Sequence, residues 1–339
     1  MVLEYLDGKQ GIQQGVGLEL LVSLSSAPWE AAHIEHYCDV LLRHAATDDA
    51  HQLGERLSKE PMVDEKLIDE YITKLDQIQR GRKDEIKTAA DALRGLEERK
   101  ANPLVIHKTG IAPLDDKLRG GLRDGQIAVI GGRPGAGKSV LLTQIAANMA
   151  ERGEGALVVS LEMMKEEIAD RLTRTREAQQ LESMPLYFID STSDLGVICS
   201  LIRVACRRHK IGVVVIDYLQ LAEVPTGKNE NRERQIATIS RRLKRLAMDL
   251  QKPVIVGSQL NRESTKRGKP SLADLRESGS IEQDADIVIL LSKSDDGPET
   301  TIDIAKQRGG SLGEVVMRLD GPRFQFVQDA PEDYWQGRL

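Results

Sequence analysis

The fold is decided by one stretch, Gly132-Arg133-Pro134-Gly135-Ala136-Gly137-Lys138-Ser139. It matches the phosphate-binding pattern G-x-x-x-x-G-K-[ST] at every fixed position, and it lies between an apolar run and a helical pattern that begins near Val140. Glycines let backbone N–H groups turn inward around phosphates at a helix N-terminus, whose dipole favours anions. The stretch therefore predicts an ATP site, with Lys138 between the β- and γ-phosphates and Ser139 on Mg²⁺.

Short β-branched runs alternate with helical segments on both sides of this motif. Runs of this kind, buried on both faces, are typical of a parallel sheet with crossover helices. The runs expected to be parallel strands cover residues 127–130, 156–161, 213–216, 254–256 and 287–291. Three later runs, at 301–305, 314–319 and 323–327, lie close together and predict antiparallel strands at the sheet edge. The sequence thus predicts an α/β fold with a mostly parallel central sheet.

Three polar residues stand where such strands end. Asp217 follows the run 213–216, where a carboxylate holds the Mg²⁺ shell. Glu162 follows the run 156–161 and is placed to orient or deprotonate the attacking water. Gln259 follows the run 254–256 and could sense the γ-phosphate. The alternative is that these side chains only cap strands, and it is strongest for Gln259.

Composition excludes several classes of protein. The chain has 339 residues, 40% of them hydrophobic and only 3% aromatic, with a formal net charge of -6, so any nucleic-acid surface must be local and cannot depend mainly on base stacking. Its three cysteines show no C-x-x-C spacing, which argues against a disulfide framework or a zinc ribbon. With neither a signal peptide nor a membrane span in the sequence, we expect a cytoplasmic protein with no membrane partner.

The first hundred residues read as helices, and the pattern changes after Pro103. We predict a helical N-terminal region at 1–80, a linker helix at 81–103, an ATPase domain at 104–328 and a tail at 329–339. His33, His36 and Cys38 lack a fourth ligand at a recognisable spacing, so we interpret them as surface residues and not as a metal site. Residues 231–250 predict a helix with an apolar stripe that faces the core and a basic face that is solvated or, less favoured, binds DNA.

Several stretches together resemble the ATPase domain of DnaB-type replicative helicases, in the family's order, from about residue 104 to residue 328. The least specific is the phosphate-binding motif; the runs around 274–286 and 305–308 are much more specific. The matching runs are Thr109-Gly-Ile-Ala-Pro-Leu-Asp115, Gly120-Gly-Leu122, Ser160-Leu-Glu-Met163, Ile216-Asp-Tyr-Leu-Gln-Leu221, Ser258-Gln-Leu-Asn-Arg262, Asp274-Leu-Arg-Glu-Ser-Gly-Ser-Ile-Glu-Gln-Asp-Ala-Asp286 and Ala305-Lys-Gln-Arg308.

The resemblance implies a RecA-like fold and roles that spacing cannot reveal. Arg308 matches an arginine finger that reaches the nucleotide of a neighbouring subunit, and Lys306 matches a lysine that also contacts phosphate. Arg276, Glu277 and Gly279 match a central-channel loop that grips the backbone of single-stranded DNA. The implied protein is a hexameric helicase that moves 5′ to 3′, works at the nucleoid, and has primase and a helicase loader as further possible partners. For Arg308 and Lys306 the alternative is a solvated basic pair, and for Arg276 and Glu277 a local ion pair.

The chain departs from this family in two places. The resemblance to the N-terminal collar domain covers only its later helices, at residues 15–42, and the stretch between Glu162 and Phe188 is shorter than in relatives, which carry extra helices there. Two other functions stay open: a RecA-family ATPase that does not unwind, and an assembly partner of another helicase. A RadA-like protein should carry a four-cysteine zinc module and a clock-type protein two P-loops, and this sequence has neither.

Overall fold

The computed structural model describes residues 47–59, 67, 71, 74, 89–101, 105–224, 232–260, 269–294 and 297–328. The chain divides into two compact units between residues 86 and 87. In the first unit, residues 47–59 form a helix that buries Leu53. Within the predicted linker, helix α5 (Ala89–Ala101) is described and exposes Leu93 and Leu96. His33, His36, Cys38, most of the predicted region 1–80 and the tail 329–339 lie outside the described residues.

The second unit is built on a nine-stranded sheet with the order β11-β10-β9-β8-β3-β7-β6-β4-β5. The six strands from β8 to β5 pair in parallel, while β8, β9, β10 and β11 pair antiparallel. The strands are β3 (Ile127–Gly132), β4 (Gly155–Ser160), β5 (Leu186–Ile189), β6 (Ile211–Asp217), β7 (Val254–Gln259), β8 (Ile287–Lys293), β9 (Glu299–Gln307), β10 (Gly313–Asp320) and β11 (Gln325–Val327). A separate two-stranded sheet joins β1 (Ile106–His107) to β2 (Leu122–Arg123).

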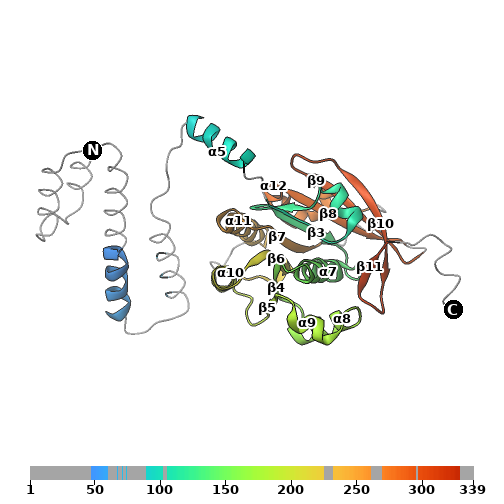
Figure 1. Cartoon of the computed structure of the whole chain (residues 1–339), viewed down its shortest axis with the longest axis horizontal. Helices are drawn as coiled ribbons and strands as arrows, with labels where there is room; N and C mark the ends of the chain where they lie inside the picture. The colour runs from blue at the N-terminus through green and yellow to red at the C-terminus, as the bar shows by residue number, and fades with distance from the viewer. Residues whose placement is uncertain are drawn as a thin grey trace, which may run out of the picture. The chain divides into compact units, whose positions relative to one another are not determined.

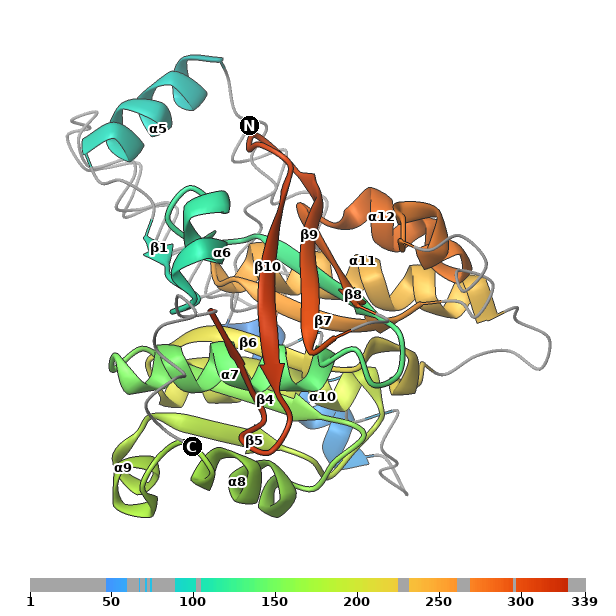
Figure 2. The ribbon, with the colours of Figure 1, turned by 90° about the vertical axis from the view of Figure 1, so that its right-hand side faces the viewer.

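Helices cover both faces of the large sheet, with α7 on one side and α10 and α11 on the other (Figure 1). Figure 2 shows α8 and α9 beyond α7, next to the β4–β5 edge. The helices of this unit are α6 (Ala112–Lys117), α7 (Lys138–Glu151), α8 (Lys165–Thr173), α9 (Ala178–Ser183), α10 (Leu195–Arg208), α11 (Arg232–Leu250) and α12 (Gly279–Asp284), with 3₁₀ turns η2 (Leu219–Leu221) and η4 (Leu272–Ser278).

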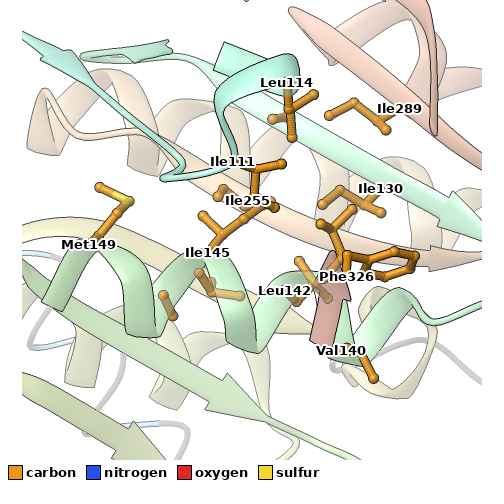
Figure 3. Packing of buried hydrophobic residues seen from close by; sticks show 14 of the residues in the cluster. Ile111, Leu114, Ile130, Val140, Leu142, Ile145, Met149, Ile255, Ile289 and Phe326 are labelled. Carbon is orange, nitrogen blue, oxygen red and sulfur yellow. The ribbon is translucent and has the colours of Figure 1, made fainter. Parts of the chain in front are cut away.

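The sheet separates two apolar cores. Strands β3, β4 and β6 are buried along their whole length, so their side chains alternate between one core and the other. On the α7 side, Leu142 and Ile145 pack against Ile130 and Ile255 of the sheet and against Phe326 of β11 (Figure 3). On the other side, the predicted apolar stripe of α11 is in the core, where Ile236 and its partners Ile239, Leu243 and Leu246 are almost fully buried.

The predicted α/β fold is confirmed, including the antiparallel strands at the edge. Three details differ from the sequence prediction. Strand β4 covers Gly155–Ser160, so it ends one residue earlier than expected, and β7 continues through Gln259. Strand β5 was not predicted, although its four residues are apolar; they are only half-buried and lie at the sheet edge. Among the described residues, no helix combines the length and apolarity needed to cross a membrane.

Candidate nucleotide-binding site

The predicted phosphate-binding loop connects the end of β3 to the start of α7. Gly135 and Gly137 adopt positive φ angles of 78° and 89°, a conformation that side chains disfavour. At Gly137 a Cβ atom would also lie 2.6 Å from Cζ of Phe326. Gly137 is the N-cap of α7, so the free N–H groups of the helix's first turn point into the loop. The local geometry is that of an anion cradle.

Lys138, the first residue of α7, lies among groups of opposite charge. Burial lowers the pKa of its ammonium group, while the carboxylates of Asp217 and Glu162 act in the opposite direction. Its Nζ atom is 4.2 Å from the centroid of the Tyr218 ring. The peptide bond between Asp217 and Tyr218 is cis. The structure therefore brings together Lys138, Asp217 and Glu162, which lie far apart in the sequence.

Asp217, at the end of β6, carries a charge that its surroundings do not favour. Burial raises the pKa of its carboxyl group, whereas a hydrogen bond from the Ser139 hydroxyl and the charge of Lys138 lower it. Its Oδ1 atom is buried and accepts no hydrogen bond from the residues that the structure describes. A Cβ atom on Gly257 would lie 3.0 Å from that oxygen, so a glycine keeps the space beside it open. A hydroxyl and a carboxylate with an unsatisfied oxygen are donors that suit Mg²⁺.

Glu162 is exposed and follows β4 by two residues. The turn that carries it is closed by Ser160, whose Oγ donates to the Met163 carbonyl at 2.6 Å and accepts from the Met163 amide at 3.2 Å. The Leu161 amide donates to the Asp217 carbonyl at 2.8 Å, which ties this turn to the end of β6. The structure thus places an exposed carboxylate near Lys138 and Asp217, whose pKa values it influences.

Gln259 lies beside the loop, because it pairs with Gly132 in the parallel register of β7 and β3. Its backbone is held by Gln220 of η2, whose Nε2 donates to the Gln259 carbonyl at 3.2 Å and whose Oε1 accepts from the Gln259 amide at 3.1 Å. Nε2 of Gln220 also lies 3.0 Å from Oγ of Ser258. Gln220 was not predicted as a site residue, although it lies in the run 216–221 that resembles the helicase family.

Lys306 and Arg308 are not brought to this site. In the sheet register, Ile287 at the start of β8 pairs with Ala128 and with Gln307, whereas Leu291 pairs with Gly132 at the loop. The two basic residues therefore lie at the amino ends of the parallel strands, and the loop lies at their carboxyl ends. The six residues of β3 separate these ends by roughly 16 Å. Neither side chain can act on a nucleotide held by its own subunit.

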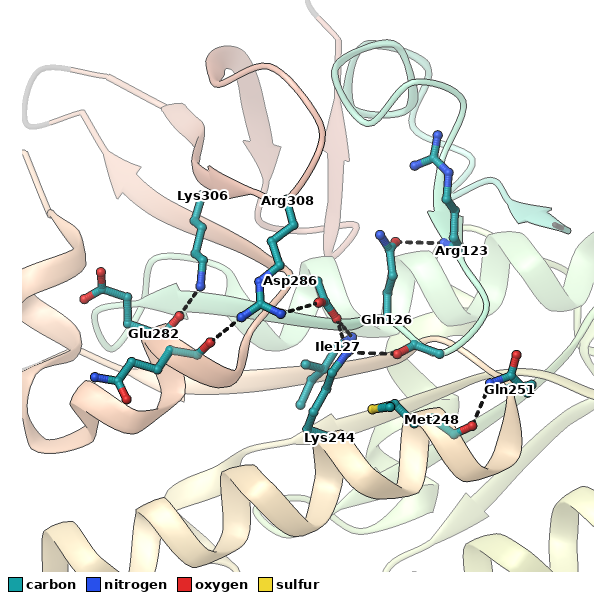
Figure 4. Close-up of polar contacts among 12 residues, drawn as sticks. Arg123, Gln126, Ile127, Lys244, Met248, Gln251, Glu282, Asp286, Lys306 and Arg308 are labelled. Carbon is teal, nitrogen blue, oxygen red and sulfur yellow. Dashed lines mark hydrogen bonds and ion pairs between the residues drawn. The ribbon is translucent and has the colours of Figure 1, made fainter. Parts of the chain in front are cut away.

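At that opposite end, both basic side chains meet the carbonyl groups of α12 (Figure 4). Lys306 Nζ donates to the Glu282 carbonyl, and Arg308 Nη2 donates to the Gln283 carbonyl at 2.7 Å. Burial, followed by the charge of Arg308, lowers the pKa of Lys306. Arg308 remains 55% exposed at its side chain. The predicted DNA-contacting residues Arg276, Glu277 and Gly279 lie at the junction of η4 and α12, and their side chains are outside the description.

Comparison with known proteins gives matches along most of the chain. The family model "DnaB-like helicase C terminal domain" matches residues 107–178 and 173–328. The chain is 31% identical to the Replicative DNA helicase DnaC of Bacillus subtilis (strain 168), covering 92% of this chain and 78% of the relative. It is also 31% identical to the Replicative DNA helicase DnaB of Geobacillus stearothermophilus, covering 95% of this chain and 81% of the relative.

Two solved structures are similar to most of the chain. One, described as an ATPase domain, is 28% identical with a TM-score of 0.65, covering 73% of this chain and 100% of that one. The other, described as "The Structure Of A DnaB-Like Replicative Helicase And Its Interactions With Primase", is 27% identical with a TM-score of 0.69, covering 91% of this chain and 82% of that one.

Proposed function

Because the chain belongs to the DnaB-like helicase family, we propose that it forms a hexameric ring that moves 5′ to 3′ along single-stranded DNA and separates the duplex ahead of it. The chain is a replicative DNA helicase that hydrolyses ATP. The single observation that supports the ring is that the proposed catalytic residues lie in two separate places. Lys138 and Asp217 are at one end of the parallel strands, and Arg308 is at the other.

The nucleotide half of the site supports defined roles for its residues. Residues 132–139 wrap the phosphates with backbone N–H groups, and Lys138 neutralises charge on the β- and γ-phosphates. Ser139 and Asp217 would hold Mg²⁺, which when bound would neutralise phosphate charge. Glu162 orients the attacking water and accepts its proton, and Gln259 senses whether a γ-phosphate is present.

The second half of the site must come from a neighbouring subunit. Arg308 and Lys306 act there, and a finger that stabilises transition-state charge raises the hydrolysis rate by ~10³–10⁵. The turn after β9 exposes Leu312, whose side chain is 62% accessible, close in sequence to Arg308. We propose that this exposed leucine belongs to the surface that a second copy of the chain covers.

The residues after β7 and around α12 supply the proposed DNA contact. The Arg276 guanidinium and the backbone amides at Glu277 and Gly279 would hold phosphates of one strand without reading its bases, which agrees with the low aromatic content. A relative's structure is described with its primase, so primase is a proposed partner here, as is a helicase loader. Work at the nucleoid follows from the same proposal.

Strand separation on forked DNA tests the proposal. The substrate has a free 5′ tail on the strand to be encircled, and a fork with only a 3′ tail is the control for direction. We expect ATP-dependent unwinding of the first fork, none of the second, and none by Lys138→Ala. ATP hydrolysis that single-stranded DNA stimulates, without unwinding of either fork by assembled protein, would contradict the helicase mechanism and favour a translocase that does not unwind.

A further inference from the structure

Asp286, the residue just before β8, is fixed through every polar group that it has. Its amide donates to the Ile127 carbonyl at 3.0 Å, and its carbonyl accepts from the Arg308 amide at 2.8 Å. Its Oδ2 atom accepts from the Ile127 amide at 2.8 Å and from Lys244 Nζ at 2.6 Å. Oδ1 faces Arg308 Nη1 at 3.4 Å. Asp286 is only 6% exposed, so its carboxylate has little freedom to turn away from these partners.

This carboxylate carries one negative charge and faces two cations. Lys244, on α11, takes the short contact and also donates to the Gly125 carbonyl at 3.1 Å. Arg308 takes the long one, at a separation where a hydrogen bond is weak. The basic face of α11 was predicted to be solvated; Arg241, Arg242 and Arg245 are exposed as expected, but Lys244 turns inward to Asp286 (Figure 4).

The Arg308 guanidinium is consequently oriented by its contacts but only weakly bound by them. Two points fix its guanidinium, the Gln283 carbonyl at 2.7 Å and the Asp286 carboxylate at 3.4 Å, and more than half of the side chain stays exposed. A planar guanidinium has five N–H donors in a fixed fork, so two contacts on one side orient the remaining donors outward. Such a group is pre-aligned for a phosphate that arrives from outside the subunit.

We propose that Asp286 is a positioning residue for Arg308, and that Lys244 keeps the contact weak enough for Arg308 to be released to a neighbouring nucleotide. Asp286 acts only through Arg308. The inference rests on the proposed function, in which Arg308 works on the site of the next subunit. If this is correct, a substitution of Asp286 lowers the rate of ATP hydrolysis when it is in the subunit that supplies Arg308. The same substitution has no effect when it is in the subunit that binds the nucleotide.

Mixed rings separate these two subunits. One variant, Arg308→Ala, keeps a nucleotide site and lacks the finger; the other, Lys138→Ala, lacks the site and keeps the finger. Where the intact nucleotide site of an Arg308→Ala subunit faces Arg308 of a Lys138→Ala subunit, we expect ATP hydrolysis to return. Asp286→Asn is then added to one variant or to the other. On the Lys138→Ala subunit it should lower kcat on the order of tenfold with KM for ATP unchanged, because only transition-state contact is lost. On the Arg308→Ala subunit it should add no further loss.

The outcomes distinguish the inference from the proposed function. An equal loss on both sides, or no loss on the Lys138→Ala side, overturns the positioning role. If the two variants restore no hydrolysis in assembled mixed rings, Arg308 does not act on the nucleotide of a neighbouring subunit. In that case the proposed function is wrong, and so is the positioning role of Asp286. Should Asp286→Asn not fold, Lys244→Gln tests the proposal instead. It leaves Arg308 as the one cation beside Asp286 and so strengthens that ion pair. It should lower kcat only when it is placed on the Lys138→Ala subunit. An equal effect on both sides overturns the proposal here too.

Discussion

At the residue scale, burial works against the charges that the site needs. It lowers the pKa of the Lys138 ammonium and raises the pKa of the Asp217 carboxyl, so in the absence of ligand burial makes the charged form of each group less favourable than it is in the unfolded chain. A cation and a polyphosphate would reverse that preference by supplying the missing partners of both groups. The nucleotide-free site is thus less stable than it could be, because its charges are kept for the ligand.

Asp217→Asn should make the nucleotide-free protein more stable at pH 7. The folded-state pKa of Asp217 lies above its unfolded value, so the ionised carboxylate costs stability in full above the folded pKa. This cost shrinks as pH falls through the folded pKa and is gone below the unfolded pKa. We expect a melting temperature roughly 2–4 °C higher than wild type at pH 7, with a difference that shrinks on acidification. Calorimetry without nucleotide or Mg²⁺ checks this. A variant less stable than wild type at pH 7 would contradict the claim that the ionised Asp217 carboxylate destabilises the nucleotide-free protein.

Spacing along the chain was enough to predict that some candidate site residues lie together, but it did not reveal others. Lys138 and Ser139 sit in a contiguous motif, and Asp217 and Glu162 follow strands, so spacing along the chain carries their prediction. Gly257 and Gln220 were missed because their roles depend on side chains from other strands. Asp286 and Lys244 were missed for the same reason: the contact joins residues 42 positions apart, on a face predicted to be solvated.

At the scale of elements, strand β11 is held against α7 by one polar side chain. Gln144 of α7 forms two hydrogen bonds with the backbone of Phe326, from Nε2 to the carbonyl at 2.9 Å and from the amide to Oε1 at 2.8 Å. One side chain thereby replaces the missing neighbour of an edge strand. The Phe326 ring then packs over the position where Gly137 lacks a Cβ atom.

Gln144→Leu should weaken the attachment of strand β11 to helix α7. The substitution keeps the volume of the side chain but leaves a buried amide and carbonyl without partners, at a cost of about 2–4 kcal/mol in the free energy of unfolding. Chemical denaturation measures the loss, and hydrogen exchange should accelerate first at Phe326. Gln180→Leu is the matched control, since Gln180 bonds to Glu151 at the surface and its loss should cost under about 0.5 kcal/mol. Equal losses in the two variants would contradict the role given to Gln144.

Most elements of the sheet were predicted from their apolar runs. The buried runs of β3, β6 and β7 and the 3.6-residue period of α11 are read directly from the chain, as are the antiparallel strands at the edge. Strand β5 was missed although its four residues are apolar, and its half-buried position at the sheet edge is known only from the structure. The Lys244 exception on α11 arises because a basic residue at the border of an apolar stripe can turn either way, and only the tertiary partner Asp286 decides it.

At the scale of the whole molecule, hydrolysis should depend on protein concentration. If Arg308 completes the site of the next subunit, an isolated subunit lacks a finger. We expect ATP turnover per subunit to fall by ~10³-fold or more as the protein is diluted below its assembly concentration. Mass photometry on the same dilution series reports assembly, and Arg308→Ala should show low turnover at every concentration. Constant turnover down to the monomer would rule out a shared site.

The placement of the P-loop and Arg308 at opposite ends of the same strands has a consequence for the geometry of assembly. If Arg308 completes the site of the next subunit, the contact is heterologous, since a donor surface on one copy meets a different, acceptor surface on the next. Any open row of such copies ends with one acceptor that lacks its arginine and one arginine that has no acceptor. Closure into a circle removes both loose ends at once and gives the circle an inherent sense of rotation, because every subunit points the same way around it.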